Sequence, residues 1–194
     1  MKTTLGIIAV IIGIVGYIPY FRDMIAHKTK PHAFTWFIWT VLTGIAFFAQ
    51  VHDGGGPGAW VTGVTTLISI IITVVAFRVG RQNIVRVDWY FLAGALAALA
   101  VWAITDDPVW SVILITIIDA IAFVPTFRKS YHKPYEETLF TFTMSGLKYI
   151  FGIAALSVFT VTTVLYPLSL VITNMLFVAM LVMRRRSQAA TINR

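Results

Sequence analysis

The chain has 194 residues, with 15 basic and 8 acidic side chains and a net charge of +7. Apolar residues make up 58% of it and charged residues only 12%, and the mean hydropathy is +0.84. Because soluble domains carry about 25% charged residues, this composition excludes a soluble enzyme and predicts a membrane protein. The chain has no cysteine, which excludes disulfides and thiolate metal sites.

Seven apolar runs, bounded by charged residues or Gly/Pro clusters, are long enough to cross a hydrocarbon layer of about 30 Å. The first run resembles a signal peptide, but it ends without the small residues of a cleavage site, so we expect it to remain as a helix. The pattern therefore predicts an all-α membrane protein. Its seven transmembrane helices are predicted at 4–21, 34–51, 59–77, 87–104, 109–127, 138–156 and 158–183.

Basic residues occur in alternate loops. Thirteen of the 15 Lys and Arg residues fall on one side of the predicted spans, and the three loops on the other side carry none. By the positive-inside rule, the N-terminus is outside and the C-terminus is cytoplasmic, which requires an odd number of spans. The short loops, the absence of cysteine and the modest size favour the inner membrane of a bacterium.

The two halves of the chain resemble each other. Residues 16–22 match 122–128 at a spacing of 106, with a proline and an arginine at the same places, while Lys30-Pro31 matches Lys133-Pro134 at a spacing of 103. A three-residue deletion would separate the two registers.

Two three-helix units with the same orientation need one helix between them, which predicts a 3+1+3 arrangement. The first repeat covers 1–80, the linker helix 81–106, and the second repeat with its basic tail 107–194.

These features resemble the SWEET/MtN3 and PQ-loop superfamily. The resemblance rests on Pro19 and Pro125 in the first helix of each half, a basic loop after each, and the motifs Thr35-Trp36-Phe37 and Thr138-Leu139-Phe140 in the next helices. It implies a transporter of a small polar solute, most simply a sugar, working by alternating access. A proton-coupled amino-acid exporter, a vitamin transporter and a receptor that transports nothing are the alternatives.

The chain departs from the superfamily at two points. The Pro-Gln dipeptide is replaced by Pro19-Tyr20 and Pro125-Thr126, so any role of that glutamine is absent. Pro31 and Pro134 lie in loops ahead of the second and sixth helices, whereas SWEETs have prolines within these helices. The resemblance therefore supports the fold of the superfamily more strongly than it supports a particular substrate.

Two ionisable residues, Asp119 and Lys148, lie deep within predicted spans and at matching depth. Each such group costs about 2.5–3.5 kcal/mol in hydrocarbon, so each is a candidate site residue. Because consecutive antiparallel helices contact each other, we expect the two to form an ion pair. The pair is either a structural link or part of a solute path, in which Asp119 is the candidate proton carrier.

Asn174 and Ser69 also reach the middle of the membrane. The resemblance implies that Asn174 faces the substrate, since SWEETs present an asparagine from the seventh helix; otherwise it links helices. Trp36 and Trp39 are interfacial anchors or stack on a substrate. The predicted substrate-binding residues are therefore Asp119, Lys148, Asn174, Ser69, Trp36 and Trp39.

Small and polar residues form stripes along single helix faces, which indicate either close helix packing or the lining of a path. The stripes are Thr62, Thr65 or Thr66, Ser69 and Thr73 in the third helix, and Thr141, Ser145, Lys148 and Gly152 in the sixth. In the first helix, Gly6, Gly13 and Gly16 predict a face of close helix contact.

Pro19 and Pro125 lie near the cytoplasmic surface, where each is a hinge or simply ends its helix. No catalytic motif is present and all four histidines lie in loops, so we expect neither an enzyme nor a metal or cofactor. The expected partners are a small polar solute and the lipid bilayer, without nucleic acid. The chain is expected to act as a monomer or homo-oligomer.

Overall fold

The computed structural model describes residues 1–79, 84–86, 89–90, 92–93, 96, 100, 104 and 108–192. These residues form six α-helices, one short 3-10 helix and no strand. The helices are α1 (Lys2–Ile25), α2 (Ala33–His52), η1 (Gly56–Ala59), α3 (Trp60–Val79), α5 (Pro108–His132), α6 (Leu139–Ala155) and α7 (Val161–Ile192). Each α-helix matches a predicted span, whereas most of the predicted helix at 87–104 lies outside the described residues.

Five of the described helices, α1, α2, α3, α5 and α7, are long and apolar enough to cross a membrane, and α6 is an apolar helix of 17 residues. Their exposed faces are also apolar. In α1, for example, Ile7, Ile11, Ile14 and Ile18 are exposed along one face, as suits contact with lipid. The chain is therefore a helical membrane protein.

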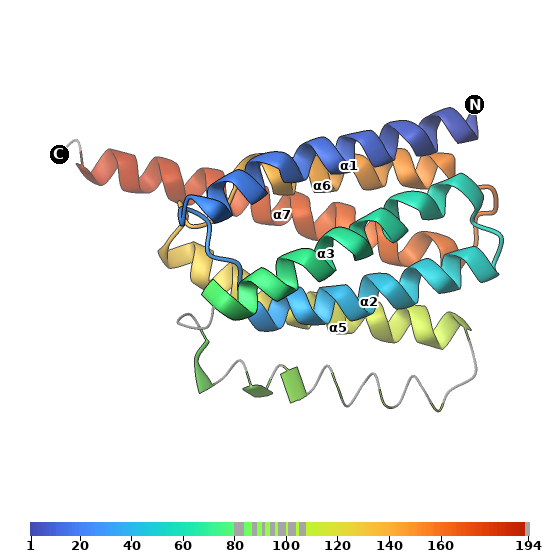
Figure 1. Cartoon of the computed structure of the whole chain (residues 1–194), viewed down its shortest axis with the longest axis horizontal. Coiled ribbons are helices and arrows are strands. Elements are labelled where there is room, and N and C mark those ends of the chain that lie inside the picture. The colour runs from blue at the N-terminus through green and yellow to red at the C-terminus, as the bar shows by residue number, and fades with distance from the viewer. Residues whose placement is uncertain are drawn as a thin grey trace.

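The helices lie along one another in a single bundle (Figure 1). In that view α1, α3, α5 and α7 run in one direction, and α2 and α6 run in the other. In the first half α3 packs on α1 and α2, and in the second half α7 packs on α5 and α6. The halves meet where α1 packs on α6 and where α2 packs on α5. The packing of α1, α2 and α3 is thus matched by that of α5, α6 and α7.

Two hydrogen bonds join the halves at equivalent places. The Thr35 hydroxyl donates to the carbonyl oxygen of Ala122 at 3.1 Å, and the Thr141 hydroxyl donates to the carbonyl oxygen of Gly16 at 2.8 Å. Both the two donors and the two acceptors are 106 residues apart. One spacing therefore relates both contacts between the halves.

The same spacing corrects the predicted alignment of the second helices. α2 begins at Ala33 and α6 at Leu139, again 106 residues apart. The register of 103, and the three-residue deletion inferred from it, are wrong. They rested on the Lys-Pro dipeptides at 30–31 and 133–134, which lie in the loops and are not held to the register of the helices.

The small-residue face of α1 allows α6 to approach closely, as predicted. A Cβ atom at Gly16 would lie 2.5 Å from the Cβ of Met144, and one at Gly6 would lie 2.7 Å from the carbonyl oxygen of Pro57. At Gly13 the nearest atom would be Cδ of Lys148, at 3.2 Å. The glycines thus make room both for the helix contact and for the lysine stem.

Pro19 and Pro125 both lie inside their helices. α1 continues beyond Pro19 to Ile25, and α5 continues beyond Pro125 to His132. The interpretation of these prolines as helix ends is therefore wrong. A proline within a helix leaves the carbonyl four residues earlier without its usual bond, so the role of these positions as hinges stays a prediction.

A buried ion pair lies at the end of the bundle that carries the basic loops. The Lys129 ammonium bonds to the Glu137 carboxylate and donates to the carbonyl oxygen of Lys30 at 2.6 Å. Only 5% of the Lys129 side chain and 1% of the Glu137 side chain are exposed. Burial raises the pKa of the Glu137 carboxyl, and the Lys129 ammonium offsets part of this rise. The pair ties α5 to the loops that precede α2 and α6.

Helix α7 runs beyond its predicted end at residue 183. Arg184 donates to the carbonyl oxygen of Tyr131 at 2.9 Å, and Arg185 donates to that of Glu137 at 2.7 Å. Two arginines of the basic tail therefore fasten α7 to the end of α5 and to the loop that follows it.

We expect Gly16→Leu to weaken the contact between α1 and α6, since its side chain would overlap Met144. Overpacking of this kind costs about 1–3 kcal/mol. The midpoint of thermal unfolding in detergent should fall, while the matched Ile18→Leu change on the exposed face should leave it unaltered. Equal midpoints for the two variants would contradict the close contact.

We expect Lys129→Met to destabilise the protein by about 3–5 kcal/mol, because it leaves a buried carboxylate without its partner. Adding Glu137→Leu removes the second charge and should restore most of this loss. Thermal unfolding of the two variants measures the difference. A double variant no more stable than the single one would show that the two charges do not act as a pair.

Candidate functional site

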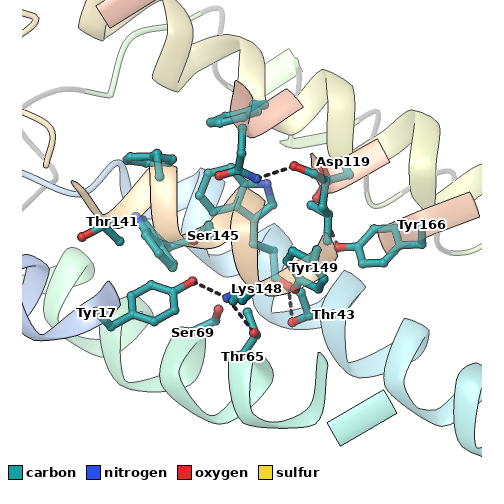
Figure 2. A pocket seen from close by; sticks show the side chains of 16 residues that line it. Tyr17, Thr43, Thr65, Ser69, Asp119, Thr141, Ser145, Lys148, Tyr149 and Tyr166 are labelled. Atoms are coloured by element: carbon teal, nitrogen blue, oxygen red, sulfur yellow. Dashed lines mark hydrogen bonds between the residues drawn. The ribbon is translucent and has the colours of Figure 1, made fainter. Parts of the chain in front are cut away.

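A cavity lies among the described helices, and all six α-helices contribute to its wall (Figure 2). The space open to the centres of water molecules is about 40 Å³, enough for about three waters at about 10–15 Å³ each. In this conformation the helices therefore leave only a small space between them. Its lining residues are Tyr17, Trp36, Trp39, Thr43, Thr65, Ser69, Asp119, Phe123, Thr141, Phe142, Ser145, Lys148, Tyr149, Tyr166, Leu170 and Asn174.

All six residues predicted from the sequence to bind substrate line this one cavity. They come from five different helices and from both halves of the chain. The residues are Trp36 and Trp39 on α2, Ser69 on α3, Asp119 on α5, and Lys148 and Asn174 on α6 and α7 respectively.

Lys148 is completely surrounded by protein, with 1% of its surface exposed. Its ammonium donates to the Thr65 hydroxyl at 2.8 Å and, at 3.4 Å, to the Tyr17 hydroxyl. It also lies 4.7 Å from the ring centre of Tyr17 and 4.9 Å from that of Tyr149, close enough for cation–π attraction. The charge is thus held by hydroxyl groups and aromatic faces.

Asp119 is equally buried, with 1% exposed, and its carboxylate accepts a hydrogen bond from the Tyr166 hydroxyl at 3.2 Å. No cation of the described residues forms an ion pair with it. Figure 2 shows Asp119 beside Tyr166, away from the group formed by Lys148, Tyr17 and Thr65.

The predicted ion pair between Asp119 and Lys148 is therefore wrong. The prediction assumed that α5 and α6, being consecutive, lie against each other. In the structure α7 packs on both of them, α5 packs on α2 and α6 packs on α1, while α5 and α6 make no extensive contact of their own. The two charges consequently share a cavity but have separate partners.

The remaining predicted residues lie in the cavity wall and differ in their hydrogen-bond partners. The Asn174 amide donates to the carbonyl oxygen of Leu170 at 2.7 Å, and the Trp36 indole donates to the Tyr20 hydroxyl at 3.0 Å. Ser69 is buried in the cavity wall, with 1% exposed. Trp36 thus lies in the bundle as part of an aromatic cluster and does not act only as an interfacial anchor.

Two buried polar atoms of the wall have no hydrogen-bond partner in the described part of the chain. They are the indole nitrogen of Trp39 and the hydroxyl of Tyr149. A buried polar group without a partner costs about 1–3 kcal/mol, so such groups call for a ligand, a water or a functional reason. Both residues line the cavity, where an occupant can reach them.

The sequence analysis did not identify several lining residues. Four of them carry hydroxyl groups: Tyr17, Thr43, Tyr149 and Tyr166. Tyrosines in apolar helices carry no signal of their own, because they also serve as ordinary core residues. A signal was present in the repeat, however. Four pairs of lining residues are 106 apart: Tyr17 and Phe123, Trp36 and Phe142, Trp39 and Ser145, and Thr43 and Tyr149.

The polar stripes on α3 and α6 divide between two uses. Thr65 and Ser69 line the cavity, as do Thr141 and Ser145. At the other end of the α6 stripe, a Cβ atom at Gly152 would lie 2.7 Å from Val61, so this position serves close helix packing. The α6 stripe therefore combines the two alternatives that the sequence left open, and the α3 stripe lines the cavity through Thr65 and Ser69.

Among the described residues, no group of three or more His, Cys, Asp or Glu side chains could hold a metal ion. The site instead combines one ammonium, one carboxylate, hydroxyls, an amide and aromatic rings around one small cavity. No family model matches the chain, and neither a curated protein nor a solved structure does.

Proposed function

We propose that this protein is a secondary transporter that moves a small polar solute through the central cavity by alternating access. The observation that carries the proposal is the burial of Lys148 and Asp119 in one cavity between two matched sets of helices, where neither has an ionic partner among the described residues. Ionisable groups within hydrocarbon are costly, and where they face an internal cavity they commonly mark a solute or ion path. Sugars are the solutes that the family resemblance suggests.

The arrangement supports two parallel repeats of the 3+1+3 type. The contacts of α1, α2 and α3 correspond to those of α5, α6 and α7, and the spacing of 106 relates helix starts, hydrogen bonds and lining residues. The end of α3 and the start of α5 lie at opposite ends of the bundle in Figure 1, as one linking span between them would require. Parallel repeats of this kind are a common basis for alternating access.

Contacts between the halves occur at both ends of the bundle. At the end with the basic loops, the Lys129 ammonium donates to the carbonyl oxygen of Lys30, and the hydroxyl oxygens of Thr29 and Thr138 lie 2.7 Å apart. At the opposite end, which carries the glycine-rich segment 54–58, the Ser157 amide donates to the Gly55 carbonyl oxygen at 3.1 Å. A solute can enter only if one set of contacts opens, and Pro19 and Pro125 are the proposed hinges.

A proton-coupled mechanism is the second candidate, because Asp119 is a buried carboxylate whose bonded partner is a neutral hydroxyl. Such a group can bind and release a proton without breaking an ion pair. Dependence of the flux on a pH gradient would separate this mechanism from uniport. A receptor that holds a partner without transport is the remaining alternative, and uptake itself distinguishes it.

Purified protein in liposomes should take up at least one solute from a labelled panel of sugars, amino acids and vitamins. We expect Lys148→Ala and Asp119→Asn to abolish this uptake while the protein still inserts, because each removes a charge of the cavity. Lys133→Ala, on an exposed loop, is the control. Undiminished uptake by both cavity variants would remove these residues from the mechanism, and no uptake by the wild type would favour a receptor.

The proposed orientation places the basic loops in the cytoplasm of a bacterial cell. Because the natural chain lacks cysteine, single-cysteine variants report it cleanly. His52→Cys should react with a membrane-impermeant thiol reagent added outside intact cells, whereas Lys28→Cys should react only after the membrane is opened. The reverse pattern would contradict the orientation.

A further inference from the structure

We infer that the solute of this cavity is a small zwitterion of the amino-acid class, with its carboxylate bound at Lys148 and its ammonium bound at Asp119. This inference rests on the proposed transport function and specifies its solute. It is carried by the way the two charges of the cavity are partnered, and by the polar atoms around them that have no partner.

The first step is a contrast within the same molecule. Where a buried lysine and a buried carboxylate serve as a structural link, as Lys129 and Glu137 do, their side chains bond directly. In the cavity the corresponding charges, Lys148 and Asp119, form hydrogen bonds only with hydroxyls, as far as the described part of the chain goes. They are held on α6 and α5, which α7 keeps apart.

The second step concerns which occupant would compensate both charges. A neutral sugar would leave each buried charge without a counter-charge, and a simple anion or cation would neutralise only one of them. A zwitterion supplies a carboxylate to the ammonium and an ammonium to the carboxylate, without changing the net charge of the cavity. Since unpaired buried charges are costly, this occupant gains most from the site.

The third step is the supply of further bonding groups. An ammonium has three N–H donors, and the described contacts of Lys148 use two of them, so one remains for a carboxylate. The Trp39 indole N–H and the Tyr149 hydroxyl are buried in the wall, have no hydrogen-bond partner among the residues that the structure describes, and can donate to further acceptor atoms of an occupant. Asp119 binds Tyr166 through one carboxylate oxygen, which leaves its second oxygen for an ammonium.

The remaining lining suits the side chain of such a solute. Trp36, Phe123 and Phe142 present aromatic surface on the same cavity. Phe123 and Phe142 stack with their ring centres 6.1 Å apart. Charged groups and aromatic surface on one cavity match the chemistry of a molecule with a zwitterionic head and an apolar remainder, although the space of about 40 Å³ has to widen to admit it.

The test uses the full chain purified in detergent and a matched series of probes. L-phenylalanine carries both charges, phenethylamine lacks the carboxylate, 3-phenylpropionate lacks the ammonium, and glucose carries neither. L-alanine, ethylamine and propionate form the same series with a smaller side chain. We expect one zwitterion to raise the unfolding temperature and to bind at least tenfold more tightly than either of its single-charge analogues.

Two variants assign the ends of the molecule. Lys148→Met should lower affinity for the amino acid to that for the amine, while binding of the amine itself is unchanged. Asp119→Asn should lower the affinity for the amino acid to that for the carboxylic-acid analogue, while binding of that analogue is unchanged. Lys133→Met is the matched control on an exposed loop. The comparison of probes on the wild type stands even if a cavity variant fails to fold.

Several outcomes would overturn the inference. Binding of a single-charge analogue as tightly as its zwitterion would do so, as would tighter binding of glucose than of every amino acid in a full panel. Uptake of sugars but not amino acids by liposomes would reject the zwitterion and leave the transport proposal standing. Uptake of no solute of any class would reject the transport proposal itself.

Discussion

Inside a hydrocarbon layer no water is present to bond with polar groups, so each such group of the chain has to find a partner within the protein. The backbone meets this requirement by forming helices. Polar side chains meet it by facing inward, which turns the bundle into a shell of exposed isoleucine, leucine and valine around threonine, serine and tyrosine hydroxyls. The bonds from Thr35 to Ala122 and from Thr141 to Gly16 show the same requirement joining the two halves.

This constraint explains why much of the architecture could be predicted from the sequence. Apolar runs bounded by charge have few alternatives to a spanning helix, and the six described α-helices follow the predicted ranges. Ionisable residues within such runs have to be sheltered, so Asp119 and Lys148 were identifiable before their surroundings were known. Gly6, Gly13 and Gly16 were identifiable as a contact face because only close approach favours three small residues on one side of a helix.

The predictions that failed depended on which helices are neighbours. Order along the chain suggested that α5 and α6 touch, and the ion pair between Asp119 and Lys148 followed from that assumption. The intervening position of α7 is set by packing across the whole bundle, which no local pattern encodes. The alignment of Lys30-Pro31 with Lys133-Pro134 failed for a different reason, because a dipeptide in a loop can occur at different places in the two halves while the helices on either side keep the spacing of 106. The buried pair of Lys129 and Glu137 was missed because a lysine in a basic loop resembles an ordinary topological signal.

Placement of α7 between α5 and α6 also has a mechanical consequence. A ligand that touches both the carboxylate and the ammonium would bridge two helices that scarcely meet otherwise, adding a bond across the bundle that the empty protein lacks. Recognition and closure would then be one event, with the strength of the bridge deciding how long the helices stay together. A molecule that contacts only one of the two groups would occupy the cavity without joining the two helices. The protein would then distinguish solutes by how far they stabilise the closed conformation as well as by how tightly they bind.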